Sequence, residues 1–200
     1  MNTRMLCALI ALVLLAAVAG CSDNSSERQQ VVCEVQSVNA GAPLVAAYVQ
    51  DGGDGVIDGV DDTFPTDLVS VAFTARPYAA DVSSIVSDGV YSSFIITSYD
   101  LRWQPGANAP AGLDLSAYNV AGAPFYLQVL VGDDAAGAVL VGGRAVKEAV
   151  AGVLGLGWSG AQDFTAYAML SFTGHASGSE HETTIESGVP VTFTYAVAQD

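Results

Sequence analysis

Alternation of apolar and polar residues with a period of two is the feature that most limits how this chain can fold. The alternation places successive side chains on opposite faces of an extended backbone, and turn residues bound each run. Five long runs show the pattern: 69–75, 95–103, 125–131, 164–172 and 189–197. Weaker strands are expected at 31–38, 43–50, 137–142 and 180–186. The chain therefore reads as a series of strands.

The same alternation predicts which side chains point into a core. In the run 95–103, the odd-numbered residues should share one face, with Trp103 pointing inward. In the last run, Phe193 should point inward in the same way. The residues of these runs are largely β-branched or aromatic, which suits a half-buried pleated surface.

One segment breaks the strand pattern. Residues 144–154 place Val146, Val150, Val153 and Leu154 on one face of a helix, and they include the only lysine of the chain, Lys147. Long helices do not alternate with the strands, which argues against a doubly wound α/β fold. The pattern predicts an all-β fold, a single antiparallel sandwich of about 7–9 strands with one short helical insertion.

The N-terminus has the layout of a secretory signal. A short start containing Arg4 is followed by an uncharged apolar stretch that is short for a membrane span. The stretch ends in Val18-Ala19-Gly20-Cys21, which resembles the lipobox of bacterial lipoproteins. An ordinary signal with a chance cysteine, or an uncleaved helix, is the alternative.

The lipobox resemblance implies cleavage before Cys21 and attachment of a diacylglyceryl group and an N-acyl chain to that residue. Three acyl chains would hold the protein on the membrane durably, because one chain alone binds only marginally. Ser22 follows the cysteine, which in lipoproteins of cells with two membranes usually implies the outer membrane.

These features divide the chain into a signal peptide (1–20), a lipidated polar tether (21–30) and a sandwich domain (31–200). Cys33 would then be the only free thiol of the mature chain. It shares a strand face with Val31 and Val35, so we expect a buried, unreactive thiol.

The charge of the chain excludes one class of partner. Six basic and 21 acidic side chains give a net charge of −15 at pH 7. Loss of Arg4 with the signal would leave five basic residues against 21 acidic ones. Phosphates would be repelled, so nucleic acid and anionic lipid surfaces are not expected partners.

Two parts of the chain resemble immunoglobulin-like domains of uncharacterised bacterial lipoproteins. Residues 172–175 (FTGH) and 189–193 (VPVTF) resemble the last hairpin of that family, and 62–67 (DTFPTD) resembles its first loop. The resemblance implies an immunoglobulin-like sandwich and implies no activity, since such folds serve many functions.

An acidic loop at 51–62 is the best candidate for a metal site. Its alternation of aspartate and glycine offers hard oxygen ligands on a flexible backbone, which calcium prefers. The run 54–58 (DGVID), followed by Asp61, Asp62 and Phe64-Pro65, resembles the calcium repeats of thrombospondin type 3. The five candidate ligands are Asp51, Asp54, Asp58, Asp61 and Asp62. Gly52 and Gln50 stand where that repeat has aspartates, so a solvated Asp-Gly turn is the alternative.

Other motifs point to no catalytic chemistry. Residues 155–160 (GLGWSG) match a dinucleotide motif, but the required strand-then-helix order is reversed. His175 and His181 could face each other across a hairpin and bind zinc, although such tips are usually solvated. The sequence therefore predicts a non-enzymatic, lipid-anchored protein that binds or scaffolds an envelope protein or glycan, with a secreted hydrolase using loop carboxylates as the alternative.

Overall fold

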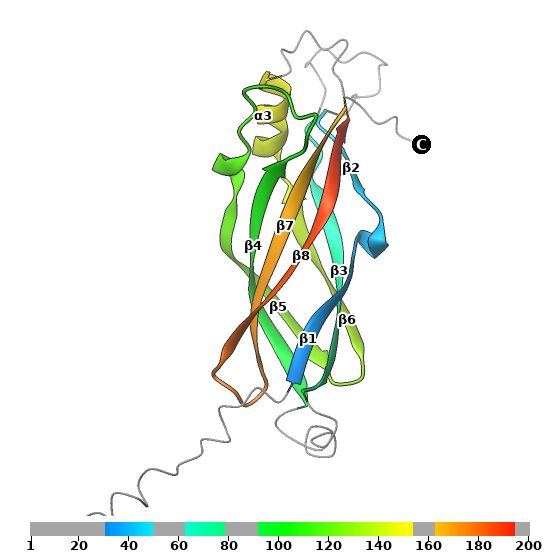
Figure 1. The fold of residues 1–200 in the computed structure, drawn as a ribbon, viewed down its shortest axis with the longest axis vertical. Coiled ribbons are helices and arrows are strands. Elements are labelled where there is room, and N and C mark those ends of the chain that lie inside the picture. The colour runs from blue at the N-terminus through cyan, green and yellow to red at the C-terminus, as the bar shows by residue number, and fades with distance from the viewer. Residues whose placement is uncertain (1–30, 50–62, 79–91, 154–162, 195–200) are drawn as a thin grey trace, which may run out of the picture.

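The chain folds mostly into β-strands arranged as two facing sheets (Figure 1). This computed structural model describes residues 31–49, 63–78, 92–153 and 163–194. The strands are β1 (Val31–Val38), β2 (Leu44–Ala47), β3 (Asp67–Pro77), β4 (Ser93–Pro105), β5 (Val120–Leu130), β6 (Asp134–Gly142), β7 (Phe164–Ala176) and β8 (Glu182–Thr194). The helical elements are η2 (Asn39–Gly41), η4 (Ser116–Tyr118) and α3 (Arg144–Val153).

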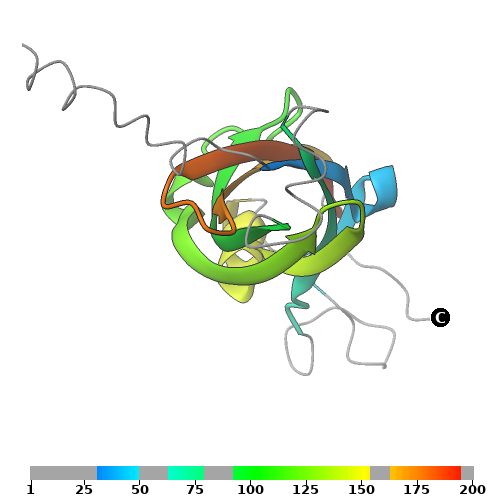
Figure 2. The same ribbon diagram turned by 90° about the horizontal axis from the view of Figure 1, so that it is seen from below.

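The two sheets differ in size and in the direction of one pair. The smaller sheet has the order β1-β3-β6 and the larger has the order β2-β8-β7-β4-β5. Strand β2 runs parallel to β8, whereas every other pair in the two sheets is antiparallel. Viewed from below, the strands surround the space in which the core side chains lie (Figure 2).

The turn η2 carries the chain from the smaller sheet to the larger one. Asn39 and Ala40 adopt positive φ angles of 50° and 52°. The amide Nδ2 of Asn39 donates hydrogen bonds to the carbonyl oxygens of Ala42 and Pro43. Asparagine tolerates the left-handed region because its short side chain can bond locally in this way. This turn gives the chain its change of sheet between β1 and β2.

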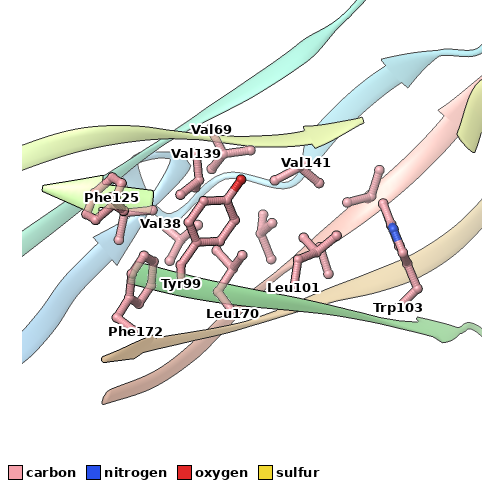
Figure 3. Close-up of a cluster of buried hydrophobic side chains, with 14 of the residues drawn as sticks. Val38, Val69, Tyr99, Leu101, Trp103, Phe125, Val139, Val141, Leu170 and Phe172 are labelled. Atoms are coloured by element: carbon pink, nitrogen blue, oxygen red, sulfur yellow. The ribbon is translucent and has the colours of Figure 1, made fainter. Parts of the chain in front are cut away.

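Aromatic side chains join the two sheets in the core (Figure 3). Phe73 of β3 meets Phe172 of β7 edge-to-face, with ring centroids 4.9 Å apart. Phe172 also contacts Phe125 at 5.5 Å and Tyr99 at 6.3 Å. The Tyr99 hydroxyl donates a 3.4 Å hydrogen bond to the Leu140 carbonyl on the opposite sheet. Such pairs stabilise a core beyond the area that they bury.

Several inward positions expected from the sequence are confirmed. The four residues of the run 69–75 that were expected to point inward, Val69, Val71, Phe73 and Ala75, are buried in β3. Trp103 and Phe193 are also buried as expected. The expected helix at 144–154 corresponds to α3, which ends at Val153. The prediction of which helix residues are buried was wrong in part. Val153, expected to be buried, is 39% exposed, whereas Lys147 is fully buried.

The expected face of the run 95–103 was wrong in its first half. Phe94 and Ile96 are buried, whereas Ile95 is intermediate and Thr97 is exposed. The register of β4 against both of its neighbours shifts between Ile96 and Ser98. A bulge of this kind inserts one extra residue and so reverses the alternation on one side of it.

The expected strands 180–186 and 189–197 form one strand, β8, over the described residues. Pro190 lies within this strand, opposite Tyr167. β2 pairs with β8 only from Val191 onward, so no partner strand flanks Pro190 on that side. Proline is tolerated at such an edge because it has no N–H to offer a neighbour. Tyr195 and Val197 lie outside the described residues.

Cys33 is buried, as expected, and this gives a testable consequence. Burial raises the pKa of its thiol from 9.0 to about 12. The thiolate is the reactive form, so this shift alone should slow alkylation of the folded chain at pH 8 about a thousandfold. The measurement is the iodoacetamide labelling rate of residues 22–200, in which Cys33 is the single cysteine, with and without denaturant. Equal rates in the two conditions would contradict the buried placement.

Candidate functional site

A groove of about 220 Å³ lies on the outer face of the larger sheet, over β4, β7 and β8. We call it the outer-face groove and define it by its lining residues: Arg102, Gln104, Met169, Leu170, Ser171, Glu186 and Ser187. The described elements leave this face uncovered, because α3 lies at one end of the sandwich (Figure 1). A ligand could therefore reach it from solvent.

Strand alternation explains which side chains reach the outer-face groove. Trp103 and Leu170 point into the core, so their neighbours Arg102 and Met169 point outward. Arg102 lies opposite Met169 on β7, and Met169 lies opposite Gly188 on β8. One row of the sheet thus runs from a long cationic side chain to a residue with no side chain.

Gly188 lets the Met169 side chain lie close to the backbone of β8 at the border of the outer-face groove. A Cβ atom at this position would lie 3.1 Å from the Ala168 carbonyl oxygen and 3.3 Å from the Met169 sulfur. The Met169 side chain therefore takes the space that a side chain at position 188 would need, and a larger residue there would push Met169 aside.

Two opposite charges border the outer-face groove. Arg102 lies on β4 and Glu186 on β8, with β7 between them. Both residues are exposed, and neither has an ion pair among the described residues. The other three described basic residues are each in an ion pair: Arg76 with Glu34, Arg144 with Glu148, and Lys147 with Asp67. Arg102 is thus the described cation that remains available to a ligand.

The row next to Arg102 adds an aromatic ring and an amide. Gln104 on β4 lies opposite Tyr167, which lies opposite Pro190 on β8. The Tyr167 side chain is 46% exposed. Ser171 and Glu186 face each other in the row on the other side. The outer-face groove therefore combines hydrogen-bonding groups with apolar surface, which is the usual make-up of a small-molecule site.

A second charged feature is buried and belongs to the framework. Lys147 of α3 is fully buried, and its Nζ lies 2.6 Å from Oδ2 of Asp67 at the start of β3. The same Nζ donates a 2.5 Å hydrogen bond to the Ala47 carbonyl oxygen. Burial raises the pKa of Asp67 and lowers the pKa of Lys147, and each residue opposes the shift of the other. With no access from solvent, the amine of this pair serves to fix α3 against β2 and β3.

The site residues expected from the sequence fall mostly outside the described part of the chain. Cys21, the glycine-rich segment 155–160 and the five aspartates of loop 51–62 all lie there. The calcium site and the lipid attachment therefore stay predictions.

The histidine pair falls within the described residues, but the hairpin does not bring the two side chains together. His175 lies opposite Glu182 rather than His181. In the ranges that the structure describes, no group of three or more His, Cys, Asp and Glu residues is placed to hold a metal ion.

One feature of the sequence indicates the outer-face groove, although it matches no known motif. Arg102 is the only basic residue between Arg76 and Arg144, and the strand pattern places it on the face opposite Trp103. The contribution of Glu186 could not be foreseen, because the register that brings β8 beside β7 is set by tertiary pairing.

Comparison with known proteins adds no relative. No protein-family model matches the chain, and a search of curated proteins finds no match. Within the described residues, no helix has the length and apolar character needed to cross a membrane.

Proposed function

We propose that this protein is a lipid-anchored binding module of a bacterial cell envelope, which holds its ligand in the outer-face groove. The observation that carries the binding role is the outer-face groove of about 220 Å³ with an unpaired charge of each sign among its lining residues, Arg102 and Glu186. Small-molecule binding sites place a few polar groups around a concave surface in this way.

The composition of the groove favours binding over hydrolysis. A glycoside hydrolase needs two carboxylates that flank the bond to be broken. Glu186 is the only acid among the lining residues of the outer-face groove. Asp100 lies in the same row of the sheet as Ser171 and Glu186, but it does not line the groove, and its Oδ1 accepts a 2.7 Å hydrogen bond from the Gly122 N–H. The alternative activity therefore lacks a pair in the candidate site.

The proposed anchor is consistent with the geometry of the domain. β1 begins at Val31, ten residues after Cys21, at the end of the sandwich opposite α3 (Figure 1). A polar tether of about nine residues would have a root-mean-square reach of about 17 Å. In a cell with two membranes, Ser22 would direct the protein to the outer membrane. The outer-face groove would then stand clear of the lipid surface.

We propose further that the sandwich is immunoglobulin-like. In that family the second strand lies between the first and the fifth, while the third, sixth and seventh form the other sheet. The order β1-β3-β6 against β8-β7-β4 is the corresponding arrangement. The Phe73–Phe172 contact then joins the two strands that a disulfide links in antibody domains. An aromatic pair would replace that disulfide in a chain whose one described cysteine is Cys33.

Substitution of the lipidation cysteine tests the anchor. Cys21→Ser should abolish both lipid attachment and cleavage, because the thiol is the attachment atom. The expected product is an unprocessed precursor that keeps Met1 and gains no acyl mass. Intact-mass measurement of both forms purified from membranes checks this, with Cys33→Ser as the control that should mature normally. A Cys21→Ser form that reaches the wild-type mass would refute the anchor.

A further inference from the structure

We propose that the outer-face groove binds a small zwitterion of dipeptide size, with its carboxylate at Arg102 and its ammonium group at Glu186. This inference rests on the proposed binding function and specifies the chemistry of the ligand. A guanidinium group presents a planar fork of N–H donors that matches a carboxylate. A carboxylate such as that of Glu186 accepts hydrogen bonds from an ammonium group.

Charge balance in the groove favours a zwitterion over a neutral ligand. A ligand that covers the groove removes water from both Arg102 and Glu186. A neutral polyol would offer hydrogen bonds but no opposite charge to either group, and charges that lose water without a partner are costly. A zwitterion supplies one partner to each. The unpaired state of both side chains in the structure is what makes these partners necessary.

The charge of the whole chain argues against a purely anionic ligand. The net charge of −15 produces a field that slows the approach of anions. Arg102 alone would have to overcome that field, with Glu186 beside it in the same groove. A ligand with no net charge is not opposed by the field and still satisfies Arg102.

The size of the groove fits a dipeptide. β4 and β8 are two strand spacings apart, which is about 10 Å. The charged ends of an extended dipeptide are separated by about 7 Å. The side chains of Arg102 and Glu186 can span the remaining distance from the two strands. The body of the ligand would then lie against Met169 and Ser171, where the groove holds about 220 Å³.

Alanyl-alanine and its end-blocked forms test the inference directly. Binding to the full protein purified in detergent is measured by calorimetry or ligand-observed NMR. Alanyl-alanine should bind, while N-acetyl-alanyl-alanine and alanyl-alanine amide should each bind about tenfold more weakly, since each lacks one charged partner. N-acetylglucosamine serves as the neutral sugar probe and should not compete.

Variants assign each end of the ligand to its residue. Arg102→Gln should weaken alanyl-alanine about tenfold but leave the amide unchanged, because the amide has already lost the carboxylate. Glu186→Gln should weaken alanyl-alanine and leave the N-acetyl form unchanged by the same reasoning. Arg76→Gln and Glu182→Gln are matched controls that remove the same charges elsewhere on the sandwich and should have no effect.

The outcomes separate the inference from the proposed function. Equal affinity for the free and blocked dipeptides, or no dipeptide binding at all, would overturn the zwitterion inference. Binding of N-acetylglucosamine in place of the dipeptide, lost in Arg102→Gln, would also overturn it while leaving the outer-face groove as a binding site. Full binding of alanyl-alanine to both the Arg102→Gln and Glu186→Gln variants would remove the groove as its site.

Discussion

Lys147→Met should destabilise the folded chain by about 3–5 kcal/mol, although methionine is of similar length and fits a buried site. Lys147 is fully buried and its amine contacts both Asp67 Oδ2 and the Ala47 carbonyl. Its removal leaves a largely buried carboxylate without its partner and a carbonyl without its donor. Most of the lost stability comes from leaving the Asp67 carboxylate and the Ala47 carbonyl without a partner, rather than from the attraction within the ion pair.

The pair itself is expected to add little net stability at neutral pH. Burial is the largest influence on both groups, so the folded pKa of Asp67 lies above its usual 3.8 and that of Lys147 below its usual 10.5. A raised carboxyl pKa contributes stability below pH 3.8 that is lost as the pH rises through the folded value. A lowered amine pKa contributes stability above pH 10.5 that is lost as the pH falls through the folded value. Burial therefore opposes the charged form of both groups, which offsets the attraction between them.

Urea unfolding of residues 22–200 measures these effects. Because the cost of each single change lies in the abandoned partner, the double variant Asp67→Asn/Lys147→Met should be more stable than Lys147→Met alone. Arg144→Met is the matched control on the same helix. Its pair with Glu148 has side chains 75% and 47% exposed, so the loss should stay below about 1 kcal/mol. If Lys147→Met lowered the free energy of unfolding as little as Arg144→Met, Lys147 would have to be solvated rather than buried.

Phe193→Ala should cost about 3–5 kcal/mol, a large share of the stability of a typical domain. Phe193 is fully buried on β8, and it stacks on Phe164 with ring centroids 5.0 Å apart. Its ring also lies 5.7 Å from Trp103 of β4. Truncation would leave a cavity between the sheets that these neighbouring rings cannot close.

The same unfolding measurement tests the face assignment of β8. Thr192→Ala is the control, because Thr192 precedes Phe193 on the strand and points to the outer face. Its loss should stay below about 1 kcal/mol, as for other surface changes. A Phe193→Ala loss of that size, or a larger loss for Thr192→Ala, would mean that the strand is turned the other way.

The strand pattern predicted most of the β structure because the alternation with a period of two depends only on residues that are close together in the sequence. In β3 and β7 every expected inward residue is buried, since both strands alternate without interruption beside the core. In β4 the expectation failed around Thr97, because a bulge depends on how two neighbouring strands pair. The alternation within one strand does not show how that strand pairs with its neighbours.

The candidate site was less predictable than the fold. Arg102, Met169 and Glu186 are 17 to 84 residues apart in the chain and belong to three strands. Their proximity follows from the register of β4, β7 and β8, which tertiary packing sets. Burial of Lys147 was hidden for a related reason, because lysine is ordinarily a surface residue and only the position of Asp67 makes its burial tolerable.

The binding role of the outer face is tested most directly by site-specific photocrosslinking in living cells. A photoreactive amino acid replaces Met169 at the outer-face groove or, in the matched control, Leu140 on the outer face of the smaller sheet. We predict a discrete adduct from position 169 that is absent from position 140 and lost when Arg102→Gln and Glu186→Gln are combined. Identical adducts from both positions, or none from position 169, would contradict a ligand in the outer-face groove.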